Sequence, residues 1–306
     1  MICSRFAHLV PLLFLTACAL QAAAQGDTPV LVQPGSQNRQ GVVPAGTAVR
    51  FGPESQVNSV ESPFCGYGPL SLGAWPKQYV AAVSSVNTLS TGFPMEGCGA
   101  CLLVVCTDPR PGVCKTPSPP FNASDADISF GSAPGEGSLS SSSRALLVQV
   151  VDRCTTCGPE GIALHAGAFD QIITAPQTGG VGVSYVRVAC RPPGNMRLRI
   201  VELRRTDGGY IKLVINNVNG FGQLVAVELA RAGLQDSNQF GFPVSGEIWR
   251  RCDNTVGAYW EYSGLPANGV ALDMRITDAT GQVVNIRSAI PANATAGDFP
   301  LNGQFR

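Results

Sequence analysis

The stretch Gly97-Cys98-Gly99-Ala100-Cys101-Leu102-Leu103-Val104-Val105-Cys106 decides how the first half of this chain folds. Its segment 101–106 is a short apolar run bounded by cysteines, which is typical of a buried strand. Two similar runs follow it, 145–151 (ALLVQVV) and 183–190 (VSYVRVAC). The segment 161–174 (GIALHAGAFDQIIT) is the one credible helical region. The first half of the chain is therefore predicted to be a β-domain stapled by disulfides.

The pattern of apolar and polar residues changes after Gly194, where the two kinds begin to alternate. Alternation at period two is what a two-sheet sandwich requires, because one face of each strand turns inward and the other outward. A sandwich of about 100 residues is a common size for this architecture. The alternating runs are 196–203 (MRLRIVEL), 210–215 (YIKLVI), 223–229 (QLVAVEL), 270–276 (VALDMRI) and 282–287 (QVVNIR).

The composition agrees with an all-β protein that does not bind polyanions through a basic stripe. The chain has 306 residues, including 35 Gly and 23 Pro, which suits many turns between short strands. Lys and Arg together number 21, as do Asp and Glu, and only 14% of residues are charged. No basic run stands out along the sequence, so binding to nucleic acid or to an anionic membrane is not expected.

The N-terminal segment 1–24 has the pattern of a secretory signal peptide: Arg5, an apolar run from Leu9 to Leu20, and the small residues Ala22 to Ala24. Leu15-Thr16-Ala17-Cys18 leaves open a bacterial lipoprotein site, with a lipid on Cys18. No later segment offers 18 consecutive apolar residues, so no membrane association is expected after cleavage. Residues 25–46, polar and without apolar periodicity, are expected to form a flexible leader.

Nine of the 11 cysteines lie beyond the signal peptide, and eight of those nine precede residue 191. In an oxidising compartment this indicates a disulfide-rich first domain. The pairs Cys98/Cys101 and Cys154/Cys157 also leave a zinc site open, but residues 102–153 separate them, far more than in a zinc ribbon. Cys252 is the odd residue, expected to be either a buried free thiol or a link to another chain.

A second irregular stretch, 108–144, interrupts the first domain and is predicted to be a long surface loop. Asn122-Ala123-Ser124 in this loop and Asn293-Ala294-Thr295 near the C-terminus are glycosylation sequons. Both are candidate modification sites in a secreted protein.

Three local patterns in the first domain resemble the expansin family. They are Cys65-Gly66-Tyr67-Gly68, the stretch from Gly97 to Cys106, and Val150-Val151-Asp152-Arg153-Cys154 leading into Ala168-Phe169-Asp170. The run Tyr185 to Cys190 closes the first domain, and the sandwich resembles the family's second domain. The resemblance implies a six-stranded double-psi β-barrel over residues 47–192, then an immunoglobulin-like carbohydrate-binding β-sandwich over residues 194–306. It also implies secretion and loosening of cell walls without cutting them.

The resemblance implies a pairing of the cysteines as well: Cys65 with Cys98, Cys101 with Cys190, and Cys106 with Cys114. Cys154 and Cys157 are then left to join each other.

The cleft of related barrel hydrolases needs two carboxyl groups, one protonated and one ionised. Asp152 matches an acidic cleft residue of the family and is our first candidate for a polar group that lines a glycan-binding surface. The alternative is that Asp152 orders its own turn by accepting backbone hydrogen bonds. Aligning Ala168 and Phe169 with the family places Ala163 where expansins carry a second Asp, so the general acid is missing.

Other polar positions of the implied cleft also depart from the family. Val49 and Phe51 fall where expansins have Thr and Tyr, and Thr47 substitutes for the Thr only if the register slips by two residues. His165 has a suitable intrinsic pKa to act as an acid, and Glu160 and Asp170 lie close to it in sequence. The alternative for His165 is an ordinary surface or capping residue. With His8 and His165 as the two histidines of the chain, a histidine-rich metal site is excluded.

Exposed aromatic rings are what a carbohydrate-binding surface needs, because the apolar faces of pyranose rings stack on them. The resemblance offers Tyr67, Tyr210, Trp249 and Tyr259 as substrate-binding candidates, with Tyr210 and Trp249 forming a two-aromatic platform. Trp260 is assigned to the sandwich core, and Gly257 falls at a platform position where an aromatic is expected.

The leading hypothesis is a secreted, monomeric, expansin-like protein that binds wall polysaccharide, a β-glucan or hemicellulose, and loosens the wall without hydrolysis. It needs no cofactor and no metal. A binding or structural module of an extracellular matrix is the alternative, and a weak glycoside hydrolase or lytic transglycosylase-like enzyme is a third reading. A fold permits many activities, so the site has to decide among them.

Overall fold

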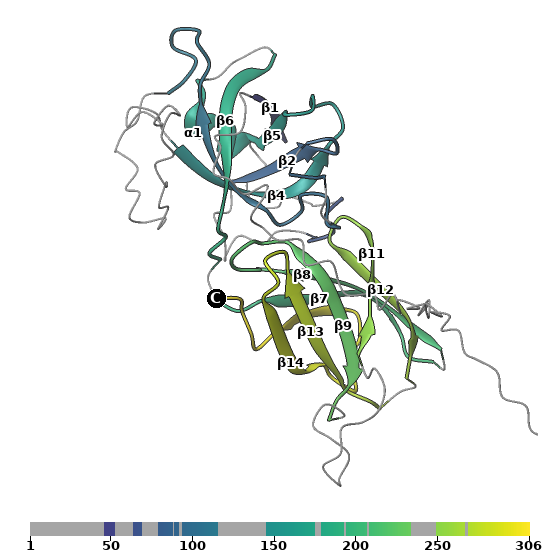
Figure 1. Ribbon diagram of the computed structural model, residues 1–306. Helices are drawn as coiled ribbons and strands as arrows, with labels where there is room; N and C mark the ends of the chain where they lie inside the picture. The colour runs from purple at the N-terminus through teal and green to yellow at the C-terminus, as the bar shows by residue number, and fades with distance from the viewer. Residues whose placement is uncertain are drawn as a thin grey trace, which may run out of the picture. The chain divides into compact units, whose positions relative to one another are not determined.

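Six short strands in the first half of the chain close into a barrel in this computed structural model (Figure 1). Their order around the barrel is β1-β5-β2-β4-β3-β6, with β1 and β6 closing the ring. The β1–β5 and β2–β4 pairs are parallel, and the remaining pairs are antiparallel. The strands are β1 (Gly46–Phe51), β2 (Val80–Ser84), β3 (Cys101–Cys106), β4 (Ala145–Cys154), β5 (Ile162–His165) and β6 (Val181–Val188).

The structure describes residues 46–52, 64–68, 79–87, 89–91, 94–115, 145–174, 179–192, 194–206, 208–233, 249–266 and 269–306. These residues fall within one compact unit, Val32–Arg306. The predicted signal peptide (1–24), the lipoprotein alternative at Cys18 and almost all of the predicted leader lie outside the described residues. So do Asn122 and most of the predicted loop 108–144.

The barrel interior is filled by branched apolar side chains of alternate strand positions. Leu102 and Val104 of β3, Val148 and Val150 of β4 and Leu164 of β5 belong to one buried cluster. Strand β3 is buried at all six positions. The apolar run bounded by cysteines therefore forms the strand that its pattern predicted.

The predicted helical region 161–174 is only partly helical. Ile162–His165 forms strand β5, and helix α1 (Ala166–Ile172) begins directly after it. Strand β5 pairs with β1 on one side and with β2 on the other. Hydrogen bonding to a strand on each side outweighs the helical pattern of these four residues. Sequence periodicity reports local pattern only, so it could not predict this pairing.

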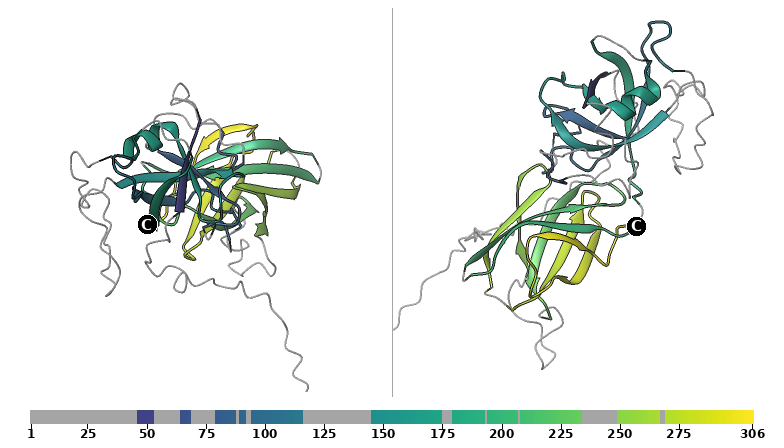
Figure 2. Two further views of the ribbon diagram at one scale, coloured as in Figure 1. Left: turned by 90° about the horizontal axis from the view of Figure 1, so that it is seen from above. Right: turned by 180° about the vertical axis from the view of Figure 1, so that it is seen from behind.

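Two sheets form the second half of the chain, and Figure 2 shows them from two further sides. The four-stranded sheet has the order β10-β9-β13-β14, and the five-stranded sheet has the order β11-β12-β8-β7-β15. The strands are β7 (Arg197–Arg204), β8 (Gly209–Asn216), β9 (Leu224–Arg231), β10 (Arg250–Arg251), β11 (Asp253–Val256), β12 (Tyr259–Leu265), β13 (Leu272–Asp278), β14 (Val283–Ile290) and β15 (Gly297–Pro300).

The five alternating runs of the sequence correspond to β7, β8, β9, β13 and β14. Strands β10, β11, β12 and β15 were not predicted, because they are short or contain Gly and Pro. Trp260 is 1% exposed and belongs to the sandwich core, as predicted. The all-β class is confirmed, and α1 is the one α-helix of the described ranges. None of the described residues forms a helix of the length and apolarity that a membrane span requires.

Four disulfides join the pairs that the family resemblance implied: Cys65–Cys98, Cys101–Cys190, Cys106–Cys114 and Cys154–Cys157. Cys252 is a free thiol with 1% exposure. Burial, aided by Asp253 and Glu228, raises the pKa of the Cys252 thiol to about 12, so it stays protonated at neutral pH. Of the two alternatives for Cys252, a buried free thiol and a link to another chain, the structure shows the buried free thiol.

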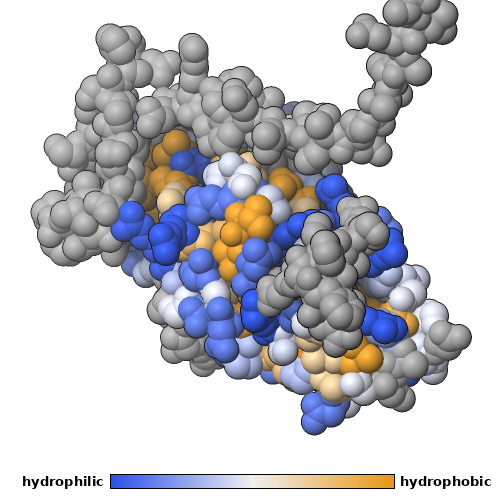
Figure 3. All heavy atoms as spheres, turned by 60° about the horizontal axis from the view of Figure 1, so that its bottom comes forward, coloured by the Kyte–Doolittle hydropathy of each residue, from blue (hydrophilic) through white to orange (hydrophobic). Residues whose placement is uncertain are grey.

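The surface is mixed in character. On the face drawn in Figure 3, groups of hydrophilic side chains surround smaller apolar patches. Scattered apolar surface of this kind is normal for folded proteins.

Candidate functional site

Four residues form one row across neighbouring strands of the barrel. Val49 of β1 pairs with Ala163 of β5, Ala163 pairs with Ala82 of β2, and Ala82 pairs with Asp152 of β4. Residues directly opposite one another on neighbouring strands face the same side of a sheet. The row therefore presents three apolar side chains and one carboxylate, and the position that the resemblance assigns to a second acid carries Ala163.

The apolar part of this row is a small cluster separate from the barrel interior. Ala82, Ala163 and Cys154 form its buried centre, and Val49, Phe51 and Cys157 pack against it. Ala163 is 4% exposed. No atom of an alanine side chain can donate or accept a proton, so the centre of the row contributes packing and no acid–base chemistry.

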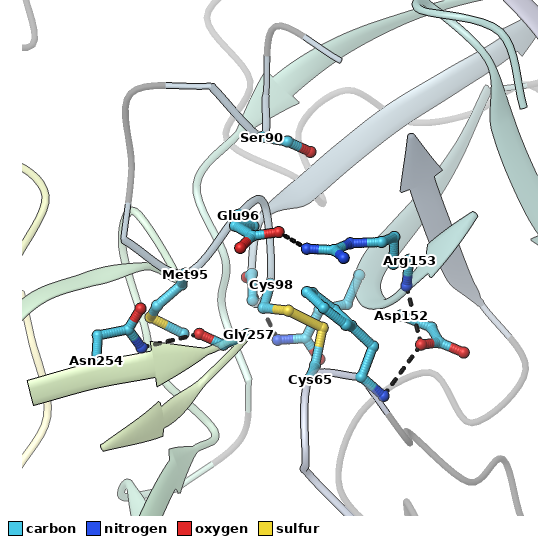
Figure 4. Close-up of a disulfide and its surroundings, with 12 residues drawn as sticks. Cys65, Ser90, Met95, Glu96, Cys98, Asp152, Arg153, Asn254 and Gly257 are labelled. Atoms are coloured by element: carbon cyan, nitrogen blue, oxygen red, sulfur yellow. Dashed lines mark hydrogen bonds and ion pairs between the residues drawn. A yellow bond between two sulfur atoms is a disulfide. The ribbon is translucent and has the colours of Figure 1, made fainter. Parts of the chain in front are cut away.

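Asp152 is held by the backbone. Its Oδ1 accepts hydrogen bonds from the backbone N–H of Arg153 (2.9 Å) and of Phe64 (3.2 Å), as the dashed lines in Figure 4 mark. Burial raises the pKa of the Asp152 carboxyl above its ordinary value, and the two N–H groups partly oppose this shift. Asp152 thus makes the backbone contacts expected of a residue that orders its turn. It is also only half-buried, as expected of a polar group that lines a glycan-binding surface.

Beside Asp152 lies a stack of three residues that the sequence did not single out. The Arg153 guanidinium carbon lies 3.7 Å from the centre of the Phe64 ring, and the Arg153 side chain forms an ion pair with Glu96 (Figure 4). Phe64 and Glu96 each stand one or two residues before a half-cystine of the Cys65–Cys98 disulfide. The implied pairing could have brought them together, but nothing in the sequence indicated that Arg153 joins them.

Glu96 is the second carboxylate of this neighbourhood. It reaches the guanidinium of Arg153, whereas Asp152 binds backbone N–H groups (Figure 4). Its side chain is 36% exposed and that of Arg153 is 31% exposed. The carboxylate of Glu96 is therefore neutralised by a cation in this structure.

His165 is buried and occupies the N-cap position of α1. It is 1% exposed, and although it stands at the N-terminal end of α1, its side chain makes no capping hydrogen bond. Its ring lies edge-on to Phe51, with 5.5 Å between ring centres, and its Nδ1 has no hydrogen-bond partner among the described residues. Burial, and then Arg50, lower its pKa, so His165 is neutral near pH 7 and is not a proton donor there.

Asp170 and Glu160 are engaged elsewhere. Asp170 forms a two-point pair with Arg50, with Nη2 to Oδ2 at 3.0 Å and Nε to Oδ1 at 3.3 Å. Glu160 accepts a hydrogen bond from the Tyr185 hydroxyl (3.3 Å). Thr47 is exposed and pairs with Gly182, so the register keeps Val49 in the row. The described residues include no group of three or more His, Cys, Asp or Glu side chains placed to hold a metal ion.

One of the four aromatic candidates, Tyr67, is buried, and another, Tyr259, packs against Gly66. Tyr67 is 4% exposed, and burial raises the pKa of its hydroxyl, so the prediction that its ring stacks on a sugar is wrong. Tyr259 is partly buried, with the Lys212 ammonium 4.4 Å from its ring centre. A Cβ on Gly66 would stand 2.2 Å from the Tyr259 ring, so Gly66 packs directly on it.

The predicted platform of Tyr210 and Trp249 is also wrong, because the two residues belong to different sheets. Tyr210 lies on β8 of the five-stranded sheet, with the Arg204 guanidinium 4.7 Å from its ring centre. Trp249 directly precedes β10 of the four-stranded sheet and lies over Arg275. At the platform position Gly257, a Cβ would stand 2.3 Å from the Phe64 carbonyl oxygen, so no side chain fits there.

Comparisons with known proteins find expansins and expansin-like proteins. Residues 198–291 match the family of the expansin C-terminal domain. The chain is 22% identical over 245 residues to "Expansin-like A3" of Arabidopsis thaliana, which covers 79% of this chain and 78% of that protein. It is 24% identical over 239 residues to "Expansin-B3" of the same plant, and this alignment covers 75% of this chain and 72% of that protein.

Solved structures share the fold. The expansin of Clavibacter michiganensis without ligand aligns with a TM-score of 0.55 at 18% identity, over 86% of this chain and 97% of that one. A variant of that expansin in complex with cellohexaose aligns with a TM-score of 0.53. Such expansins combine a double-psi barrel with an immunoglobulin-like domain. The C-terminal part of the chain thus matches the expansin C-terminal domain, and the chain as a whole is similar to expansins in sequence and in fold.

Proposed function

We propose that this protein is secreted as a monomer, binds a neutral polysaccharide of the cell wall and loosens contacts between wall polymers without cutting them. The cellohexaose complex of a protein with this fold supports a β-glucan, or a hemicellulose with a similar backbone, as the ligand. The binding energy stabilises a polysaccharide chain that is separated from its neighbours. No covalent bond changes, so no cofactor is needed.

The observation that carries the proposal is the row Val49–Ala163–Ala82–Asp152. Hydrolysis of a glycosidic bond requires a second carboxyl group, placed about 5–10 Å from the first across the scissile bond. Ala163 occupies the position that the resemblance gives to such a group, and Glu96 is paired with Arg153. The Asp152 carboxylate has two acceptor oxygens, so it can accept a hydrogen bond from a sugar hydroxyl as well as hold its turn.

The direct test compares wall creep and reducing-sugar release after purified protein is added to isolated walls. We expect creep without release of reducing sugar. Asp152→Asn and Glu96→Gln are tested in parallel with the unchanged protein. Sugar release that either substitution abolishes would overturn the non-hydrolytic reading and make the protein a hydrolase.

A second function is favoured by the apolar cluster of the row. If Ala82 and Ala163 contribute only packing, the barrel has a purely structural role and is stabilised by its disulfides. The protein is then a binding or structural module of an extracellular matrix. The discriminating variant is Asp152→Ala. Loss of creep with unchanged polysaccharide pull-down supports wall loosening, whereas no effect on either measurement supports the scaffold.

Secretion and glycosylation form part of the same proposal. Asn293 is exposed in a turn after β14, where an oligosaccharide transferase could reach it. We expect the protein from a eukaryotic secretory host to lose mass on enzymatic deglycosylation, and Asn293→Gln to reduce that loss. Retention of residues 1–24 in the secreted chain, read by N-terminal sequencing, would contradict the assigned signal peptide.

A further inference from the structure

Asn-Gly pairs are the places in a protein chain where an asparagine side chain most readily loses its amide. Glycine has no side chain to hinder its backbone nitrogen, so that nitrogen can approach the asparagine Cγ. This sequence contains three such pairs, Asn219-Gly220, Asn268-Gly269 and Asn302-Gly303. The structure describes both residues of the first and the last pair, whereas Asn268 lies outside the described residues.

The reaction joins the glycine nitrogen to the asparagine side chain. That nitrogen attacks Cγ, the bond from Cγ to the amide nitrogen breaks, and the amide nitrogen leaves as ammonia with the glycine N–H proton. Water then opens the resulting cyclic succinimide at one carbonyl or the other, which gives aspartate or isoaspartate. The net change is the uptake of water and the release of ammonia. The glycine N–H therefore has to be available for the reaction to begin.

Asn219-Gly220 is held on both sides of the reacting groups. The Gly220 N–H donates to the Cys190 carbonyl oxygen (2.9 Å), and the Cys190 N–H donates to that of Gly220 (2.7 Å). The Asn219 side-chain amide donates to the Phe305 carbonyl oxygen (3.0 Å), and the Asn219 backbone N–H donates to Oε1 of Gln304 (2.9 Å). Attack by the Gly220 nitrogen therefore requires that this network opens first.

Asn302-Gly303 lacks these restraints. Asn302 is exposed in a bend, and Gly303 is partly exposed. Among the described residues, neither the Asn302 side chain nor the Gly303 N–H has a hydrogen-bond partner. The Gly303 carbonyl oxygen accepts the Met196 N–H (3.1 Å), but this contact does not engage the attacking nitrogen. The two described pairs thus have the same residues and differ in what the fold does with the glycine N–H.

We propose that Asn302 is a modification site, at which the folded protein converts with age to aspartate and isoaspartate, and that hydrogen bonds protect Asn219 from the same reaction. Water is the other reactant. This inference does not depend on the proposed wall-loosening activity.

The modified residue lies between two anchors of the C-terminal segment. Leu301 is 1% exposed and Phe305 is 2% exposed, and both belong to the buried cluster of the sandwich. Between them, the Gln304 side-chain amide donates to the carbonyl oxygens of Gly194 (3.1 Å) and Asn217 (2.8 Å). Isoaspartate adds a methylene to the backbone between the anchors, so the segment loses part of these contacts. Ageing at this site therefore loosens the C-terminal segment from the residues that flank β7 and β8.

The test follows both pairs in the full mature chain by peptide mass spectrometry during long incubation in neutral buffer. We expect Asn302 to convert at least about tenfold faster than Asn219, because Asn219 reacts only after local opening. The matched control is the same chain unfolded in urea, where both pairs are expected to convert at similar rates. Equal rates in the folded chain would overturn the proposal. So would slow conversion of Asn219 in urea, since its protection would then come from its sequence neighbours and not from the fold.

Hydroxylamine identifies the intermediate, because it cleaves the chain at a succinimide. We expect cleavage after Asn302 in the folded protein and none there in Asn302→Gln. Absence of this cleavage from the unchanged protein would contradict the proposed route.

A second comparison separates the added charge from the altered backbone. Freshly prepared Asn302→Asp has the charge on a normal backbone, and we expect it to unfold close to the unchanged protein, because residue 302 is exposed. The aged fraction enriched in isoaspartate is expected to unfold at a lower urea concentration. An aged fraction that unfolds together with Asn302→Asp would contradict the loosening of the C-terminal segment.

Discussion

At the scale of single residues, Asp152 is defined by its backbone contacts as much as by its charge. Both hydrogen bonds that it accepts go to one oxygen, Oδ1, from the N–H groups of Phe64 and Arg153. An amide side chain keeps such an acceptor, whereas a methyl group does not. Structural and functional roles of Asp152 can therefore be separated by the choice of substitution.

We expect Asp152→Ala to lower the free energy of unfolding by about 1–3 kcal/mol, because it leaves two backbone donors without their acceptor. Asp152→Asn is expected to change it by less than about 1 kcal/mol. Urea unfolding of the two variants beside the unchanged protein checks this. Equal losses for Asn and Ala would contradict the assigned hydrogen bonds.

His165 gives a pH dependence of known sign. Burial and Arg50 lower its pKa, so the native state takes up a proton less readily than the unfolded state does. The stability that follows from a neutral His165 is present above its unfolded pKa of about 6.5 and is lost as pH falls below that value.

We expect the free energy of unfolding to decrease more between pH 7.5 and 5.5 in the unchanged protein than in His165→Phe, by up to about 1 kcal/mol. Urea unfolding at both pH values measures the difference, and the carboxyl groups common to both proteins cancel. An identical decrease in the variant would show that His165 takes up a proton equally readily in the native and unfolded states, with no lowering of its pKa on folding.

At the scale of elements, the barrel depends on disulfides that close loops of very different length. Cys101–Cys190 spans 89 residues and Cys106–Cys114 spans 8. In the chain-entropy account, the long loop constrains the unfolded state by about 4–5 kcal/mol and the short one by about 2–3 kcal/mol.

Replacing both cysteines of Cys101–Cys190 with Ala is therefore expected to cost more stability than the same change at Cys106–Cys114. The difference is about 2 kcal/mol in this account. Urea midpoints of the two double variants give the comparison. A larger loss for the short loop would mean that packing of the half-cystines, not chain entropy, dominates.

Helix α1 shows how neighbouring elements decide a local structure. Its apolar positions Ala168, Phe169 and Ile172 are buried, in agreement with the helical pattern of the sequence. The preceding residues Ile162–His165 extend as β5 because β1 and β2 lie on both sides of them. The sequence could not show this, since the partners of β5 lie about 80 and 110 residues away along the chain.

At the scale of the whole molecule, two glycines allow backbones from the two halves of the chain to touch. Gly99 precedes β3, and Gly222 lies between β8 and β9. A Cβ on Gly222 would stand 2.2 Å from the Gly99 carbonyl oxygen and 2.7 Å from the Cys190 Sγ. Gly222 also has a φ of +76°, which disfavours any other residue.

Gly222→Ala is expected to cost about 3–5 kcal/mol, since steric overlap adds to the strain of a left-handed backbone. Gly112→Ala is the control: its φ is +73°, but nothing lies within 4 Å of its Cβ position, so only about 1–2 kcal/mol is expected. Urea unfolding compares the two. Similar losses would mean that the segments around Gly99 and Gly222 separate easily.

The sequence by itself determined the all-β class, the strands with strong alternation, the core position of Trp260 and, through the family resemblance, the four disulfides. These features follow from local pattern or from a known order of motifs. It also placed Ala163 where a second acid was expected, and the strand register sets that alanine in the row of Asp152.

Only the tertiary structure decided which side chains meet. Tyr210 and Trp249 look like one platform in sequence but lie on different sheets, and Tyr67 is buried. Arg251 and Arg275 are separated along a chain without a basic stripe, yet one sheet brings them to one face. The physical reason is that strand pairing joins residues far apart in the chain, and composition and periodicity hold no record of which strands become neighbours.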